Sequence, residues 1–191
     1  MKQLKQTLFP ILLILTTGCS LLLSDYTPAS FTVSGNQAIM SGAIDGSTPD
    51  EVQRLIDEHP EVTTIVMQNV EGSVNDEANL VAARLVRQHG LHTHVPADGE
   101  IAAGGVDFFL AGVERTAVSG AKLGVHSWAT GDGTTGDQVP RDDPQHKLYL
   151  DYYAEMGIPA DFYWFTLQAA PAEDIYFMTE AELVQYQMVT R

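Results

Sequence analysis

The residues whose types and spacing suggest chemistry lie between Asp98 and Ala129. Gly104 and Gly105 open an apolar helical stretch, and an isolated histidine, His126, follows farther along the chain. A helix start offers backbone N–H groups to a developing anion, and a histidine can act as general base. These groups could serve acyl-transfer chemistry, but Ala103, which directly precedes the helix, has no group that could attack a carbonyl.

The elements before this stretch alternate between strand and helix. Two alternating runs around Gly35 and Asn36 predict a hairpin, and Ser47 with Pro49 predicts the start of a helix that ends near His59. A buried strand over 63–70, an amphipathic helix over 75–90 and a strand over 91–95 follow. Such alternation favours an α/β domain with parallel strands.

The elements after His126 begin with a polar loop over 129–144. The pattern then predicts helices over 145–157 and 159–170, a short strand and a capped C-terminal helix. Residues 31–191 are enough for one domain with its own core, so we expect a single domain.

The N-terminus has the features of a secretory signal over residues 1–18: Lys2, Lys5, an apolar run and small residues before Cys19. Leu15 to Cys19 resembles a bacterial lipobox, which implies cleavage before Cys19 and lipidation of that residue. Cys19 is the only cysteine, which excludes an internal disulfide. We expect a lipoprotein on the periplasmic side of a bacterial cell envelope, with residues 19–30 as a tether. The alternative is a simple secreted protein in which Cys19 is removed or has no role.

The chain is strongly acidic, with a net charge of −15, and removal of Lys2 and Lys5 with the signal would make it more so. Such a surface repels phosphate backbones and anionic headgroups. We therefore expect no nucleic-acid partner, and membrane contact through the lipid anchor alone.

Three other motifs point less clearly to chemistry. The "GDGTTG" segment at 131–136 is followed by Pro140 rather than a helix, which argues against a dinucleotide site. His92 and His94 share one face of a strand, yet only Asp98 has a spacing suited to a further ligand, so we expect surface or hydrogen-bonded histidines and no metal. No serine lies in the G-x-S-x-G turn of α/β-hydrolases.

The segment "IVMQNVEGSVNDEANLVAARLVRQHGLHTHV", followed by "GEIAAGGVDFFLAGVERTAVSGAKLGVHS", resembles the Clp-protease/crotonase superfamily, especially its exported Clp-protease-like members. The resemblance extends from about residue 43 to residue 190. It implies an α/β fold built as a spiral of β-β-α units, a peptide or ester substrate, no cofactor, and assembly into a homo-oligomer.

The resemblance also implies roles for individual residues. Ala103 occupies the position of the nucleophilic serine, and His126 that of the general base. The backbone N–H groups of Gly104 and Ser73 correspond to the two donors of the oxyanion hole.

The acid of the family's triad corresponds best to Asp174, with Glu173 or Asp151 as alternatives. Lys122 would be the base if His126 proved structural, because some relatives pair serine with lysine.

Alanine cannot attack a carbonyl, so this chain is not expected to perform serine catalysis. Three explanations compete: a deliberate Ser→Ala replacement, a natural pseudoenzyme that binds peptides, and a different chemistry in the same pocket. Ser127 points away from His126 on a strand, whereas Ser119 and Ser73 are conceivable substitutes. Crotonase-type chemistry on acyl-CoA needs no serine, but the chain shows no basic patch for the nucleotide phosphates.

Overall fold

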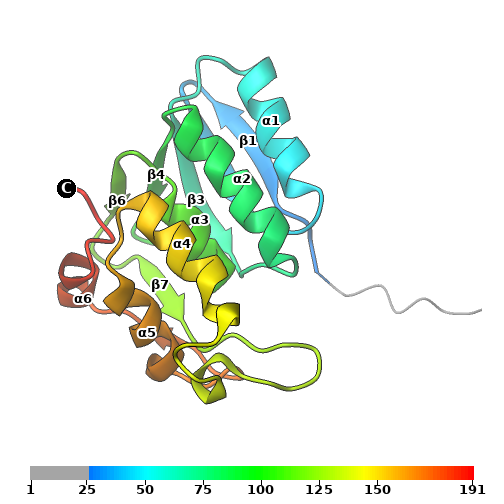
Figure 1. Cartoon of the computed structure of the whole chain (residues 1–191). Helices are drawn as coiled ribbons and strands as arrows, with labels where there is room; N and C mark the ends of the chain where they lie inside the picture. The colour runs from blue at the N-terminus through cyan, green and yellow to red at the C-terminus, as the bar shows by residue number, and fades with distance from the viewer. Residues whose placement is uncertain (1–25) are drawn as a thin grey trace, which may run out of the picture.

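The structure, a computed structural model, describes residues 26–191 (Figure 1). The predicted signal over residues 1–18, Cys19 and most of the predicted tether lie outside the described residues. Within residues 26–191, no helix is both long enough and apolar enough to cross a bilayer.

The first two strands form the predicted hairpin. β1 (Ser30–Ser34) pairs antiparallel with β2 (Gln37–Ser41), and Gly35 at the turn has a φ of +60°. Alternate residues of β2, Ala38 and Met40, are fully buried, as expected for a strand with one face on the core.

The central part of the sheet is parallel, as the alternation of strands and helices predicts. β3 (Thr64–Val70) pairs with β2, and then with two different strands along its length. Its first half pairs with β4 (His92–Val95) and its last residues with β5 (Glu100–Ala102). The remaining pairs are β4 with β6 (Arg115–Ala117), β5 with β7 (Lys122–Val125), and β7 with β8 (Tyr176–Phe177), the last antiparallel.

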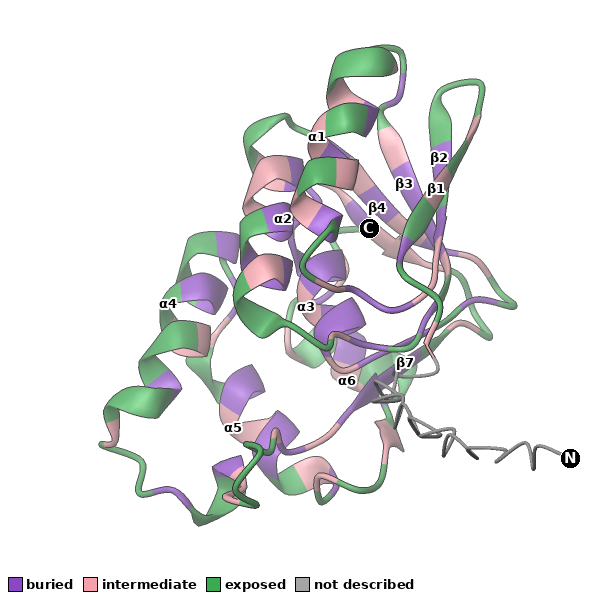
Figure 2. Cartoon of the chain, turned by 90° about the vertical axis from the view of Figure 1, so that its right-hand side faces the viewer, coloured by how far each residue is buried: buried purple, intermediate pink, exposed green. Residues whose placement is uncertain are grey.

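Helices α1 (Thr48–Glu58), α2 (Asp76–Gln88) and α4 (Lys147–Met156) lie along one face of the sheet (Figure 1). Their inner faces are buried and their outer faces are exposed (Figure 2). Pro49 lies in the first turn of α1, as predicted, but the Ser47 side chain makes no capping hydrogen bond there. At α2, the Asn75 side chain accepts from the Ala78 N–H and caps the helix.

The aromatic helix α5 (Ala160–Ala169) packs within the chain. Phe162 is fully buried, whereas Trp164 and Phe165 are partly buried against the core. Beyond β8, α6 (Glu180–Gln185) starts with a capping box between Thr179 and Glu182. The aromatic side chains of α5 are thus used inside one domain, and the predicted self-association remains a prediction.

The change of pairing partner along β3, from β4 to β5, determines where the site forms. Because β5 and β7 continue the sheet beyond the end of β3, their carboxyl ends meet the loop that follows β3. β5 leads into α3 (Gly104–Leu110) with a single residue, Ala103, between them. The chain reverses direction sharply there, beside the loop that carries Ser73.

Candidate functional site

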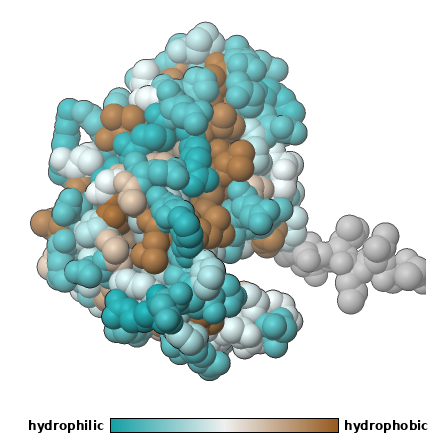
Figure 3. All heavy atoms as spheres, viewed as in Figure 1, coloured by the Kyte–Doolittle hydropathy of each residue, from teal (hydrophilic) through white to brown (hydrophobic). Residues whose placement is uncertain are grey.

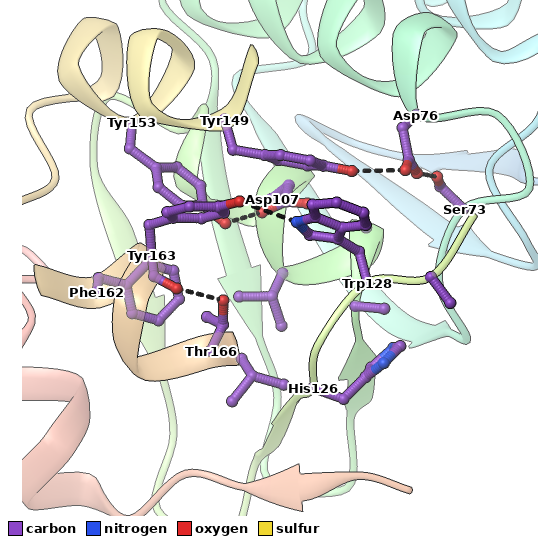
Figure 4. Close-up of a pocket in the computed structure, with 15 residues that line it drawn as sticks. Ser73, Asp76, Asp107, His126, Trp128, Tyr149, Tyr153, Phe162, Tyr163 and Thr166 are labelled. Atoms are coloured by element: carbon purple, nitrogen blue, oxygen red, sulfur yellow. Dashed lines mark hydrogen bonds between the residues drawn. The ribbon is translucent and has the colours of Figure 1, made fainter. Parts of the chain in front are cut away.

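A cavity of about 180 Å³ opens at the carboxyl ends of β5 and β7. Ala103, Gly104, Ser73 and His126, all predicted from the sequence, line it together. Its other walls come from the starts of α2 and α3, from Trp128, and from aromatic side chains of α4 and α5 (Figure 4). On this face of the molecule, apolar residues are interspersed with polar ones (Figure 3).

Ala103 has a strained backbone, with φ 48° and ψ −122°. Among residues 26–191 only Ala103 and Gln187 combine a side chain with a positive φ. Such a conformation costs about 1–3 kcal/mol and persists only where the surroundings impose it. Here the Ala103 N–H donates to the Gly124 carbonyl at 2.9 Å, and the Ala103 carbonyl accepts from Val106 at 2.8 Å. The turn therefore holds the β-carbon of residue 103 at the cavity.

The loop containing Ser73 lies directly against this turn. A β-carbon placed on Gly72 would lie 3.4 Å from that of Ala103, and one on Gly104 would lie 2.5 Å from that of Ser73. The Ile44 N–H donates to the Gly72 carbonyl and the Val74 N–H donates to the Ile44 carbonyl, which fixes the loop. These two bonds form a parallel β-bridge between Ile44 and Ser73, in which the Ser73 N–H points away from Ile44.

The N–H groups of Ser73 and Gly104 are both available to a ligand, because no hydrogen bond found within residues 26–191 uses either of them. The buried Asn79 side chain fixes the start of α3 by donating to the Gly104 carbonyl at 2.8 Å. Two preorganised donors beside a cavity are what an oxyanion hole requires.

His126 is half-buried and follows directly after β7. Its Nδ1 lies 2.8 Å from the Ser127 carbonyl oxygen. A carbonyl can only accept, so Nδ1 carries the proton in this contact, and in the neutral imidazole Nε2 keeps its lone pair. His126 is therefore oriented by a backbone carbonyl, with one nitrogen able to accept a proton.

The structure does not bring the predicted acid to His126. Asp174 is exposed and accepts from the Ile175 N–H at 2.8 Å in the loop before β8. Neither alternative lines the cavity: Glu173 is exposed, and Asp151 pairs with Lys147 on α4.

Other sequence candidates also lie elsewhere. Lys122 pairs with Glu100 at 3.0 Å, outside the cavity, and Ser119 is exposed in the turn before β7. Ser127 is fully buried and bonds to Asp137, so it does not face the cavity with His126.

The two strand histidines are hydrogen-bonded, as expected. His94 lies 2.7 Å from the Thr116 hydroxyl, and His92 accepts from the Glu114 N–H at 3.2 Å. Burial lowers the pKa of His94. Within residues 26–191 no group of three or more His, Cys, Asp or Glu side chains could hold a metal.

Asp107 is a cavity residue that the sequence reading missed. It lies one turn after Ala103 on α3, and its carboxylate accepts from the Tyr153 hydroxyl at 2.6 Å. Burial, with a smaller contribution from the charge of Asp76, raises the pKa of Asp107 to about 7, against the opposing effect of the Tyr153 hydrogen bond. The only sequence signal was an acid within an apolar helix start.

A second acid, Asp76, lies at the start of α2 and also lines the cavity. It accepts from the Ser73 hydroxyl, and from the Tyr149 hydroxyl at 2.6 Å (Figure 4). Burial raises the pKa of Tyr149, and the charge of Asp76 raises it further. The Ser73 side chain is therefore engaged by Asp76, while the Ser73 N–H is not.

No protein-family model matches the sequence, and no curated protein matches it. Solved structures do match in fold. A mutant of the 1510-N membrane-bound stomatin-specific protease, solved with a substrate peptide, is 14% identical with a TM-score of 0.52, covering 78% of this chain and 71% of that one. An enoyl-CoA hydratase from Bacillus halodurans is 12% identical with a TM-score of 0.53, and the match covers 84% of this chain and 71% of the hydratase. The chain has the Clp-protease/crotonase-like α/β fold in a single domain.

Proposed function

We propose that the cavity is the peptide site of a Clp-protease-like serine hydrolase whose nucleophile is absent from this chain. The observation that carries the proposal is the strained turn at Ala103, flanked by the Gly104 and Ser73 N–H groups and sharing its cavity with His126. Strain at a non-glycine residue is kept where a side chain must be presented to a ligand.

Each group has a part in this proposal. A carbonyl of a bound peptide or ester accepts from Gly104 and Ser73, which places its carbon over the β-carbon of Ala103. With a serine at 103, Nε2 of His126 would take the hydroxyl proton as the oxygen attacks, and would later donate it to the leaving group. With alanine at 103, the chain binds the carbonyl but does not cut it.

The fold likeness to a protease solved with a substrate peptide supports a peptide ligand. The likeness to an enoyl-CoA hydratase leaves crotonase-type chemistry as the runner-up. Against it, none of the described residues that line the cavity is Lys or Arg, so no side chain there would bind nucleotide phosphates.

The decisive experiment restores the nucleophile. The Ala103→Ser variant is expected to react with a fluorophosphonate probe, and the added His126→Ala change should abolish the reaction. The unmodified chain should not label. If a folded Ala103→Ser variant stays inert, the site is a peptide-binding pseudoenzyme site. If the unmodified chain labels, another serine does the chemistry.

The codon for residue 103 in the source genome separates the two origins of this alanine. A serine codon means an enzyme altered to prevent cleavage, and an alanine codon means a natural pseudoenzyme.

We further propose that the protein is exported and anchored by a lipid on Cys19, on the periplasmic side of a bacterial envelope. The support is the sequence of residues 1–19. Cys19→Ala should abolish palmitate labelling and release the protein from membranes. Membrane association and labelling that survive this change would refute the anchor.

Self-association is a separate proposal and rests on the superfamily resemblance. Light scattering at micromolar concentration should give a mass above that of one chain. A monomeric mass would refute it.

A further inference from the structure

The wall of the cavity beyond Ala103 combines aromatic rings with acids. Tyr149 and Tyr163 stack with ring centres 5.7 Å apart, and the cavity is also lined by the rings of Tyr153, Phe162 and Trp128 (Figure 4). The rings are held by one another, because Trp128 donates to the Tyr163 hydroxyl at 2.9 Å. Aromatic faces attract cations, most strongly where water is excluded.

Asp107 adds a carboxylate to this wall. One oxygen accepts from Tyr153 at 2.6 Å, and the residue's own carbonyl accepts from Tyr152, so its position is fixed. No hydrogen bond within residues 26–191 uses the second carboxylate oxygen, and Asp107 lines the cavity. A ligand that fills the cavity must therefore satisfy this oxygen or leave it desolvated.

The spacing on α3 links this carboxylate to the carbonyl site. Asp107 follows Ala103 by four residues, which on a helix corresponds to about 6 Å along the axis on the same face. A side chain next to a carbonyl held over Ala103 must be long and unbranched to reach Asp107. Lysine has that length and ends in a donor.

We propose that the cavity is a specificity pocket for a basic side chain, lysine foremost, of the bound peptide, with Asp107 as the residue that selects it. This inference rests on the proposed function, since it assumes that a peptide carbonyl lies over Ala103. The acidic surface of the chain, with a net charge of −15, attracts such peptides.

An apolar side chain fits this pocket less well. It would fill the aromatic part but would cover the second oxygen of Asp107 without a partner, which is costly for a carboxylate. A basic side chain supplies the missing donor and a cation for the rings.

The pH dependence follows from the groups that face the pocket. Burial raises the pKa of Asp107 to about 7, so its charge is lost as the pH falls from 8 to 6. Asp76 on α2, Tyr149 and Tyr153 on α4, Tyr163 on α5 and His126 after β7 also line this cavity. The affinity for the lysine peptide should fall below pH 7. In Asp107→Asn, the share of this pH dependence that comes from Asp107 should be absent.

The test uses the unmodified chain and three probes: acetyl-Ala-Ala-Lys-Ala-Ala-amide and its counterparts with norleucine or Nε-acetyl-lysine at the centre. Isothermal titration calorimetry at pH 8 should show the lysine peptide binding about tenfold tighter than either counterpart, or more. Norleucine lacks the ammonium group, and acetylation removes its charge.

One variant and one control test whether Asp107 causes the preference for lysine. Asp107→Asn keeps an oxygen for Tyr153 but removes the charge, and should reduce the preference for lysine to less than about twofold. Asp57→Asn removes one negative charge from an exposed position on α1, outside the cavity, and should keep the preference. Equal or tighter binding of the norleucine peptide by the unmodified chain overturns this inference alone. Failure of all three peptides to bind at millimolar concentration overturns the proposed peptide site and this inference with it.

Discussion

Gly104 and Ser73 are in contact so close that a β-carbon on Gly104 would lie 2.5 Å from that of Ser73. The same atom would lie 2.9 Å from Nδ2 of Asn79. The side chain of Ser73, in the loop after β3, therefore packs directly against the α-carbon of Gly104 at the start of α3, and only a residue without a side chain fits there.

Gly104→Ala should open this contact. We expect a loss of about 1–3 kcal/mol in the free energy of unfolding, because the buried Asn79 and the fixed loop have little room to move. In the Ala103→Ser background it should also abolish fluorophosphonate labelling. Gly131→Ala is the matched control, since a β-carbon there meets nothing within 4 Å. Equal stability of the two variants in urea unfolding would show that the contact is not tight.

Ala103→Gly tests whether the turn is strained. Glycine adopts a φ of 48° without the steric cost that alanine pays, so the variant should gain up to about 1 kcal/mol in unfolding free energy. Ala111→Gly, at φ −69° and fully buried, should lose about 1 kcal/mol or more. If both variants lose stability equally, residue 103 is not strained.

Asp107→Asn should change the dependence of stability on pH. The folded pKa of Asp107 is about 7 against 3.8 without burial, so ionisation opposes folding, and stability falls as the pH rises between these values. At pH 8 the variant should be more stable by roughly 2 kcal/mol, about half of the full linkage value, because the carboxylate opens onto the cavity. Thermal unfolding at pH 5 and pH 8 measures it. If the stability of Asp107→Asn relative to the unmodified chain does not grow from pH 5 to pH 8, the pKa of Asp107 is not raised.

The sequence was sufficient to predict most of the local structure. The hairpin at Gly35, the helix after Ser47 and the capped C-terminal helix at Thr179 each follow from patterns within a few residues. Four of the predicted site residues, Ala103, Gly104, Ser73 and His126, do share one cavity. They lie at the ends of strands and at a helix start, where the alternating topology brings chain segments together.

The wall of the cavity could not be predicted in the same way. Asp107 looks like an ordinary helix residue until Tyr153 of α4 packs over it, and the approach of α4 and α5 depends on packing across the whole domain. Asp174 was assigned through the family resemblance, yet the loop before β8 directs its carboxylate to a neighbouring N–H.

The Asp174→Asn change tests which group orients His126. The family resemblance implies the Asp174 carboxylate, whereas in the structure it is the Ser127 carbonyl. In the Ala103→Ser background we expect fluorophosphonate labelling at an unchanged rate, because the Ser127 carbonyl orients His126. A markedly slower reaction, with the fold intact by circular dichroism, would mean that Asp174 reaches His126 in the working site.

The central claim is that two backbone N–H groups hold a peptide carbonyl over Ala103, and amide NMR of the unmodified chain tests it most directly. Titration with acetyl-Ala-Ala-Lys-Ala-Ala-amide should move the amide proton signals of Gly104 and Ser73 downfield together, as both form hydrogen bonds to the ligand. Gly90, which follows the end of α2 opposite to Asp76, should not move. Saturable shifts elsewhere in the cavity with Gly104 and Ser73 unchanged would contradict the claim.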